Sequence, residues 1–216
     1  MQEKDSCCIT DDGSREKKEY WDANFEKNET PNWIETEAPW IMTWINDIDL
    51  SKEATIFCAG VGNANIVEHL LQNGYKNIIA NDISQVALDT LSSRVNNNSV
   101  TYLQDDLISP KKIQDYKGKI DLYIDRATLH FFTKCAEKDH YFSQMQDLLK
   151  TGGHTVIGVF SKDNKPKCCG LDLQLWSIQS LHNRMPDYNH TNSTEFAYKE
   201  LNGNIRNYIY LLAQKQ

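Results

Sequence analysis

Two glycines, Gly60 and Gly62, follow a short apolar run and precede a stretch whose apolar residues have helical spacing. Glycine at a strand-to-helix turn lets a ligand approach the backbone closely, where the first amides of the helix point outward. A GxG sequence also occurs in ordinary tight turns, but its place between a strand and a helix favours ligand binding. We therefore expect Gly60, Gly62 and the adjacent Asn63 to contact a bound ligand.

Asp82 lies 20 positions after Gly62, at the end of the second apolar run. In nucleotide-binding sheets, an acidic residue at this place accepts hydrogen bonds from the hydroxyls of a ribose. An acid there can instead stabilise the N-terminus of the following helix. Together with the glycine turn, the ribose-binding role is favoured, and the neighbouring Ile83 is expected to line the same site.

The third apolar run ends at Gln104 and is followed by Asp105, Asp106 and Leu107. Ligands of open parallel sheets bind outside the carboxyl ends of the strands. An aspartate at this third strand end can accept a hydrogen bond from an exocyclic amine such as that of adenine, and we expect Asp105 to do so. Asp106 is expected at the turn and Leu107 beside the ligand, so both belong to the predicted binding set.

An alternation of strands and helices would bring these residues to one edge of a sheet. The sequence predicts strands at residues 54–59, 77–80, 100–103, 120–124 and 154–160, and helices at 64–72, 84–95 and 137–149. Ser84 is the expected N-cap of the second of these helices. Asn73-Gly74 and residues 150–153 are expected to end the first and the third. Such alternation is typical of βαβ units with a parallel sheet.

The C-terminal part departs from this alternation. Ser177 is the expected N-cap of a helix that runs towards Met185. Two β-rich runs follow, at residues 195–200 and 205–211, and the Asn-Gly between them favours a β-hairpin. The predicted fold class is therefore α/β: a Rossmann-like, seven-stranded, mostly parallel sheet with an antiparallel C-terminal hairpin and helices on both faces.

The N-terminal segment divides into two parts. Residues 1–15 are polar and lack an apolar period, so we expect a disordered tail. Residues 16–50 are rich in aromatic side chains and predict two helices, near residues 15–26 and 34–46. We expect a helical lid here, in which Trp33 and Trp40 either cover a ligand or pack in the core.

Composition and charge disfavour several classes of partner. The net charge of −7 argues against nucleic acid, because phosphate electrostatics dominate that affinity. No run of about 18 uncharged apolar residues and no secretory leader occur, so no membrane partner is expected. The six cysteines lack CxxC spacing, which predicts no metal site and reduced thiols in a cytoplasmic protein. Lysine clusters at residues 111–119 and 162–167 are either solvated loops or a patch for an anionic substrate.

Several longer elements carry a family resemblance. They are YWD at 20–22 with NWIE at 32–35, FCAGVGNA at 57–64, NDIS at 81–84, DLYIDRATLHFF at 121–132, GGH at 152–154, KCCGL at 167–171, and HT at 190–191 with FAY at 196–198. Through them, residues 20–212 resemble the class I S-adenosylmethionine-dependent methyltransferases. The resemblance is to a small bacterial-type subgroup with DRAxxHF and CxGL elements and a thiopurine-methyltransferase-like layout. These two elements are much more specific than the glycine loop.

The resemblance implies one methyltransferase domain over residues 16–216, with residues 16–50 as its N-terminal lid. It implies methyl transfer from S-adenosyl-L-methionine and release of S-adenosylhomocysteine. The cofactor-holding residues that it adds to the set above are Asp125 and Trp33. One position departs from the family: most class I enzymes have Asp or Glu where this chain has Cys58, and that acid usually orders the loop near the methionine end.

The loop after the fourth strand flanks the transferring methyl group in this fold. A sulfonium is already an activated electrophile, so the protein mainly aligns and desolvates the acceptor. His130 is the best candidate for a general base, if the acceptor loses a proton, or else it is a half-buried structural residue. Asp125 and Arg126 either contact the substrates or form a buried ion pair that shapes the loop. These three are the candidate catalytic residues.

Two further pairs have open roles. Cys168 and Cys169 follow the fifth strand on the substrate side, where they either contact a soft, thiophilic acceptor or are small buried residues of a lid. His190 and Tyr198 either form a structural bond at the start of the hairpin or belong to the substrate wall.

A small-molecule acceptor is favoured, because the aromatic lid and the Cys168 loop would enclose a compact pocket. A protein side chain is the main alternative acceptor. A cofactor-binding protein without transferase activity is a rival that Cys58 keeps open. A nicotinamide oxidoreductase is more distant, because Asn65 stands where the GxGxxG fingerprint has its third glycine.

Overall fold

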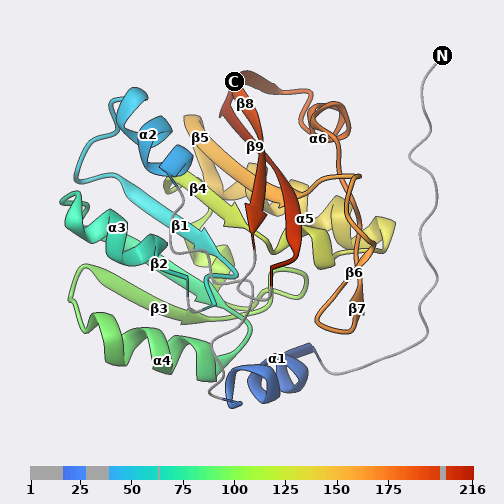
Figure 1. The fold of residues 1–216 in the computed structure, drawn as a ribbon. Coiled ribbons are helices and arrows are strands. Elements are labelled where there is room, and N and C mark those ends of the chain that lie inside the picture. Colours follow the sequence, from blue (N-terminus) through green and yellow to red (C-terminus); the bar gives the residue numbers. More distant parts are fainter. Residues whose placement is uncertain (1–16, 28–38, 63, 200–202) are drawn as a thin grey trace.

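In the computed structural model, which describes residues 17–27, 39–62, 64–199 and 203–216, seven strands form one sheet. They are β1 (Thr55–Ala59), β2 (Asn77–Asp82), β3 (Val100–Gln104), β4 (Ile120–Arg126), β5 (Leu149–Phe160), β8 (Tyr188–Lys199) and β9 (Ile205–Lys215). Their order across the sheet is β3-β2-β1-β4-β5-β9-β8 (Figure 1). The first five strands are parallel, whereas β9 pairs antiparallel with both β5 and β8. The predicted sheet and its C-terminal hairpin are therefore confirmed.

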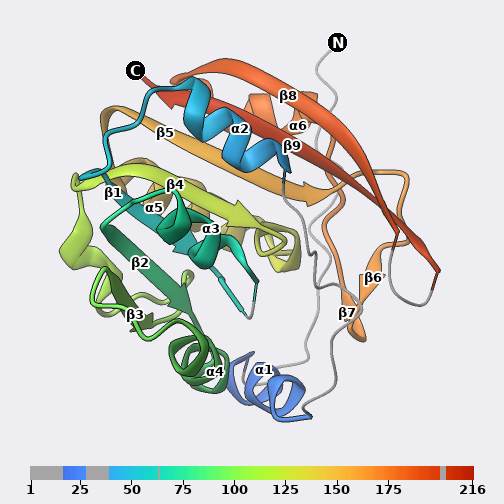
Figure 2. The same ribbon diagram turned by 60° about the vertical axis from the view of Figure 1, so that its left-hand side comes forward.

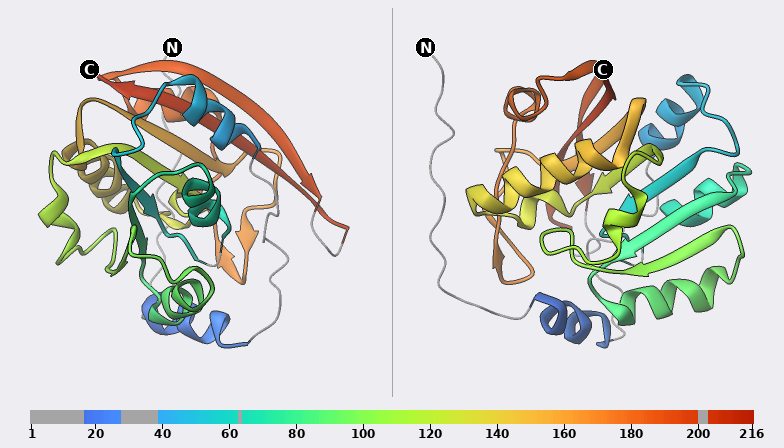
Figure 3. Two further views of the ribbon diagram at one scale, coloured as in Figure 1. Left: turned by 90° about the vertical axis from the view of Figure 1, so that its left-hand side faces the viewer. Right: turned by 180° about the vertical axis from the view of Figure 1, so that it is seen from behind.

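Alternation of side chains along the strands divides the core into two clusters. In β1, Ile56 and Cys58 belong to one cluster, and Phe57 and Ala59 belong to the other. The helices that cover the first cluster are α2 (Pro39–Asp47), α3 (Ile66–Gln72) and α4 (Gln85–Val95); those that cover the second are α5 (Cys135–Leu148) and α6 (Ile178–Arg184). Figures 2 and 3 show these two groups on opposite sides of the sheet. The expectation of helices on both faces is confirmed.

Local chemistry explains several helix ends. The Ser84 hydroxyl accepts a hydrogen bond from the Ala87 N–H at 3.2 Å, and the Ser177 hydroxyl accepts one from Ser180 at 3.2 Å. Both predicted N-caps are thus confirmed. Gly74 follows α3 with a φ of +84°, a conformation that suits glycine at the end of a helix.

β5 begins earlier than predicted. The strand starts at Leu149, so residues 150–153 lie within it instead of forming a loop. Gly152 has a φ of +77°, and the pairing with β4 shifts register between Ile120 and Leu122. Glycine permits this irregularity without ending the strand. The sequence of residues 150–153 is, however, typical of a helix stop, which explains the difference.

A second sheet is not predicted by the sequence. It consists of β6 (Lys167–Cys168) and β7 (Leu171–Asp172), which pair antiparallel. The two joining residues, Cys169 and Gly170, have φ values of +53° and +77°, as a type I′ hairpin turn requires. Strands of two residues are too short to produce a recognisable period.

The N-terminal helix α1 (Lys17–Phe25) lies beside α4 (Figures 1 and 2). The expected tail at residues 1–15, Trp33 and Asn63 lie outside the described residues, and the bounds of the domain at 16–216 stay a prediction. Within the described ranges, no helix has the length and apolar content needed to cross a bilayer. One expectation about the cysteines is wrong, because Cys135 is disulfide-bonded and not a reduced thiol.

Candidate active site

A cavity of about 460 Å³ opens where β1, β2, β3 and β4 end. One side of it is lined by the glycine loop and the strand ends: Gly60, Gly62, Asp82, Ile83, Asp105, Asp106 and Leu107. The other side is lined from α1, the short 3-10 helix η2 (Leu129–Phe131), the β6–β7 hairpin and the sheet: Tyr20, Trp21, Arg126, His130, Phe160, Cys168, Cys169 and Tyr208. The cavity thus brings together the described residues of the predicted cofactor set, apart from Asp125.

The loop between β1 and α3 depends on its glycines. Gly60 and Gly62 have φ values of +56° and +52°, which L side chains rarely adopt. A Cβ at Gly60 would lie 2.1 Å from Oγ1 of Thr128. That hydroxyl is within hydrogen-bonding distance of the carbonyls of Ala59 and Gly60, at 3.3 Å each. The loop backbone therefore packs directly against the start of η2 at Gly60, and Phe25 of α1 lies 3.3 Å from where a Cβ of Gly62 would be.

The Asp82 carboxylate is buried and ties this loop to β2. Oδ2 accepts a hydrogen bond from the Gly62 N–H at 2.8 Å, and Oδ1 accepts one from the Ser84 N–H at 2.8 Å. Burial raises the pKa of Asp82 to about 6, although its backbone hydrogen bonds act in the opposite direction. Each carboxylate oxygen has two lone-pair sites, so Asp82 can accept further hydrogen bonds from ligand hydroxyls.

Asp105 and Asp106 differ in their surroundings. The carboxylate of Asp105 is buried and accepts the backbone N–H groups of Lys111, Lys112 and Ile113 at 2.7–3.1 Å. These bonds hold the loop after β3 in place. Asp106 is only half-buried, and its Oδ1 accepts the N–H of Ile108 at 2.8 Å. Asp106 is therefore the more accessible of the two acids at this strand end.

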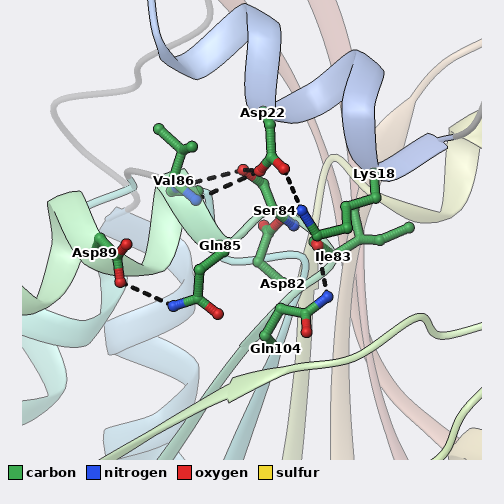
Figure 4. A network of polar contacts seen from close by, with 10 residues as sticks. Lys18, Asp22, Asp82, Ile83, Ser84, Gln85, Val86, Asp89 and Gln104 are labelled. Carbon is green, nitrogen blue, oxygen red and sulfur yellow. Dashed lines mark hydrogen bonds and ion pairs between the residues drawn. The ribbon is translucent and has the colours of Figure 1, made fainter.

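Asp22 anchors α1 at the start of α4 (Figure 4). Its Oδ1 accepts hydrogen bonds from the Ser84 hydroxyl at 2.6 Å and from the Val86 N–H at 3.4 Å, and its carboxylate pairs with Lys18. An anion at a helix N-terminus is stabilised by the helix dipole. The sequence places Asp22 in the YWD element, but nothing in the pattern indicates this contact.

Asp125 organises the loop after β4. Its buried carboxylate accepts hydrogen bonds from the Tyr141 hydroxyl at 2.7 Å, the Thr128 N–H at 2.9 Å and the Leu129 N–H at 3.1 Å. Burial raises the pKa of Asp125 to about 6, against these hydrogen bonds. Asp125 is not among the lining residues of the cavity, so its direct contact with substrates stays a prediction.

Arg126, the next residue of β4, lies on the cavity side. Its guanidinium carbon lies 5.3 Å from the centre of the Tyr208 ring. Consecutive strand residues point to opposite faces of a sheet, and this alternation separates Arg126 from the carboxylate of Asp125. Arg126 therefore brings positive charge to the aromatic end of the cavity.

His130 forms part of this aromatic wall. Its ring stacks on Phe160, with centroids 4.3 Å apart and an angle of 23° between the planes. Burial, with smaller effects of Arg126 and Arg206, lowers the pKa of His130 to about 3, so the ring is neutral at physiological pH. Its Nδ1 is buried and has no hydrogen-bond partner in the part of the chain that the structure describes. A neutral imidazole with this pKa is a hydrogen-bonding group and a weak base.

Comparison with known proteins identifies the enzyme class. Residues 56–153 match the family model described as a methyltransferase domain. This part of the chain therefore forms a methyltransferase domain. The match covers the glycine loop, Asp82, Asp106 and the loop after β4, and so includes the cavity side formed by the strand ends.

Solved structures share the fold of this methyltransferase. An S-adenosylmethionine-dependent methyltransferase from Anabaena variabilis is 14% identical with a TM-score of 0.75, over 92% of this chain and 93% of that chain. The 1,6-didemethyltoxoflavin-N1-methyltransferase of Burkholderia thailandensis, solved with 1,6-didemethyltoxoflavin and S-adenosylhomocysteine bound, is 16% identical with a TM-score of 0.64, over 90% and 82%. A curated relative, EEF1A lysine methyltransferase 2 of Danio rerio, is 23% identical over 158 residues, 65% of this chain. The chain spans 66% of that relative, just under two thirds of its length.

The described residues at the strand ends fit the adenosine part of S-adenosyl-L-methionine, the cofactor that the family resemblance implies. Both left-handed glycines line the cavity, and the buried Asp82 carboxylate keeps lone pairs for ribose hydroxyls. Cys58, which stands in place of the usual acid, packs in the hydrophobic core, where burial raises the pKa of its thiol to about 12. Cys58 is therefore a core residue and does not face the cavity.

Some site residues of the methyltransferase escape sequence analysis. Tyr141 of α5 reaches Asp125 only through the packing of the helix on the sheet. Phe160 and Tyr208 occupy paired positions of β5 and β9, so strand alternation could have placed both on one face.

The expected bond between His190 and Tyr198 is wrong. Both residues belong to β8, and eight residues of strand at about 3.3 Å per residue keep them far apart. His190 instead stacks on His182, with ring centroids 3.9 Å apart, and neither His190 nor Tyr198 lines the cavity.

Proposed function

We propose that the chain transfers the methyl group of S-adenosyl-L-methionine to a small-molecule acceptor bound between α1, η2 and the β6–β7 hairpin. The observation that carries this proposal is that one continuous cavity joins the strand ends to a region lined by aromatic side chains. The Tyr20 hydroxyl donates to the carbonyl of Cys169, and Trp21 packs edge-on against Phe131 at 5.0 Å, so α1 covers this region. Enclosure of this kind suits a small ligand.

The proposed cofactor contacts follow from the strand ends. Gly60 and Gly62 bring the loop backbone to the cofactor, Asp82 accepts from the ribose hydroxyls, and Ile83 and Leu107 provide apolar walls. The geometry favours Asp106 over Asp105 as the partner of the adenine amine, because backbone N–H groups occupy the carboxylate of Asp105.

The acceptor end supplies alignment and a dry environment. The cofactor carries a methyl group on a sulfonium, which a lone pair of the acceptor can take directly. The chain therefore has to hold that lone pair in line and exclude water. The stacked rings of His130 and Phe160 form the wall that does this, and the buried Nδ1 of His130 can orient an N–H or O–H of the acceptor. Arg126 favours an acceptor with negative charge.

The test is a calorimetric titration with S-adenosylhomocysteine, followed by an acceptor screen that begins with small thiols and amines. Wild type should bind with micromolar affinity, and Asp82→Ala should lose this binding. Asp89→Ala is the matched control, because Asp89 is an exposed acid of α4 away from the cavity. Absence of binding to the wild type would overturn the assignment of the cavity. Tight binding without turnover on any acceptor would favour a cofactor-binding sensor or scaffold.

A protein side chain is the second candidate acceptor, supported by the similarity to a relative named as a lysine methyltransferase. The discriminating experiment supplies isotope-labelled cofactor to a cell extract separated into proteins and small molecules. Label in the small-molecule fraction that is lost in Asp82→Ala supports the first proposal, whereas enzyme-dependent label confined to protein supports the second.

A further inference from the structure

Two neighbouring thiols form one wall of the cavity. The Sγ atoms of Cys168 and Cys169 lie 3.4 Å apart, and both residues line the acceptor end. Cys168 is 8% exposed and belongs to the hydrophobic core, whereas Cys169 is half-buried. Adjacent residues of an extended strand would point in opposite directions, so the turn itself must bring the two sulfurs together.

The turn holds Cys169 in a conformation that cysteine rarely adopts. With φ at +53° it occupies the first central position of the type I′ turn, where Asn, Asp or Gly is the usual residue. A backbone outlier of this kind at a ligand cavity points to a functional requirement for the side chain. The Tyr20 hydroxyl, which donates to the carbonyl of Cys169, fixes the turn from the side of α1.

Two simpler roles do not fit this geometry. The 3.4 Å separation exceeds the about 2.05 Å of a disulfide bond, and the Cα atoms of consecutive residues, about 3.8 Å apart, are closer than disulfides usually allow. A tetrahedral metal ion needs three or four donors, and no cluster of three His, Cys, Asp or Glu suited to a metal occurs among the described residues. The pair is suited to a three-coordinate ligand atom that binds two thiolates and already carries a third substituent of its own.

We propose that Cys168 and Cys169 form a dithiol site that chelates a soft trivalent centre, a monoorganic arsenical, at the acceptor end of the cavity. Thiolates prefer soft centres, and trivalent arsenic is one. With an organoarsenic oxide, both S–H bonds break, two As–S bonds form, and the oxide oxygen leaves with both protons as water. Arsenic stays trivalent, so the step needs no oxidant or reductant. This site goes beyond the proposed function, because binding of the arsenical by the two thiols does not depend on methyl transfer.

Intact-mass spectrometry of the full chain with phenylarsine oxide tests the proposal. The protein is first treated with a phosphine reductant, which is then removed. Wild type should gain one phenylarsenic unit per chain at equimolar reagent, with loss of one water. The adduct should survive excess glutathione, a monothiol, and be removed by 2,3-dimercaptopropanol.

Variants locate the adduct. Cys168→Ser and Cys169→Asn should both lose the dimercaptopropanol-sensitive adduct; Asn suits the turn, so the second variant keeps the fold while removing the sulfur. The double variant Cys7→Ser/Cys8→Ser, which removes the other vicinal pair of the sequence, and Cys58→Ser should keep it. No adduct on the wild type, or an adduct that persists in Cys168→Ser and Cys169→Asn, would overturn the proposal. Titration of the same proteins with S-adenosylhomocysteine is read separately, so failure of the cofactor site leaves this result interpretable.

Discussion

The backbone N–H of Gly62 donates a 2.8 Å hydrogen bond to Oδ2 of Asp82, which joins the glycine loop to the end of the neighbouring strand. The residue that is expected to bind the ribose therefore also holds the loop beside it. Because the carboxylate is buried, its ionised form is disfavoured and its pKa lies at about 6. The site carries an electrostatic cost that a ligand with hydroxyl donors can relieve.

Cofactor affinity should depend on pH through Asp82. The ionised carboxylate accepts from ligand hydroxyls, and a pKa of about 6 means that this form is lost as the pH falls through 6. The Kd for S-adenosylhomocysteine should be flat above pH 7 and rise by up to roughly tenfold per pH unit below 6. Calorimetry at pH 5, 6 and 7.5 measures this. Asp82→Asn should bind weakly with a shallower pH profile, and an unchanged profile in that variant would assign the effect to another group.

Gly60→Ala should destabilise the protein more than replacement of a left-handed glycine usually does. The new Cβ would lie 2.1 Å from Oγ1 of Thr128, in addition to the backbone cost of about 1–2 kcal/mol. Gly74→Ala is the matched control, since Gly74 also has a positive φ but open space around its missing Cβ. Denaturant unfolding should show a larger loss for Gly60→Ala, together with loss of cofactor binding. Equal losses would mean that the contact with Thr128 is unimportant.

Tyr141→Phe should destabilise the protein and disturb the loop after β4. The variant removes a 2.7 Å hydrogen bond to the buried carboxylate of Asp125, a loss worth about 1–3 kcal/mol. Tyr188→Phe provides the comparison, because the buried Tyr188 hydroxyl has no hydrogen-bond partner in the described ranges. Urea midpoints of the two variants measure the difference. A Tyr141→Phe protein as stable as wild type would show that Asp125 does not need this donor.

Cys169→Asn should stabilise the protein by roughly 1 kcal/mol, because Asn tolerates the left-handed conformation better than Cys does. The thermal unfolding midpoint should rise accordingly. Cys168→Ser offers no such relief, since Cys168 belongs to a strand and packs in the core, and its midpoint should stay or fall. A lower midpoint for Cys169→Asn would indicate that contacts of the Cys169 thiol outweigh the backbone cost.

The sequence predicts the framework of this protein better than it predicts the contacts inside the site. Period and caps suffice for the sheet, for Ser84 and for Ser177, because these depend on neighbours along the chain. Asp105 shows the limit of such reasoning: its position at a strand end predicts ligand binding, but backbone groups up to eight residues away occupy its carboxylate. The supporting role of Tyr141 likewise depends on tertiary packing.

Helix α1 touches both ends of the cavity within a single turn. Asp22 holds the start of α4 beside Asp82, and Tyr20, two residues earlier, holds the carbonyl of Cys169. Neither contact can be released by a rigid movement of the helix without straining the other. Any displacement of α1 would therefore loosen the cofactor end and the acceptor end of the cavity together.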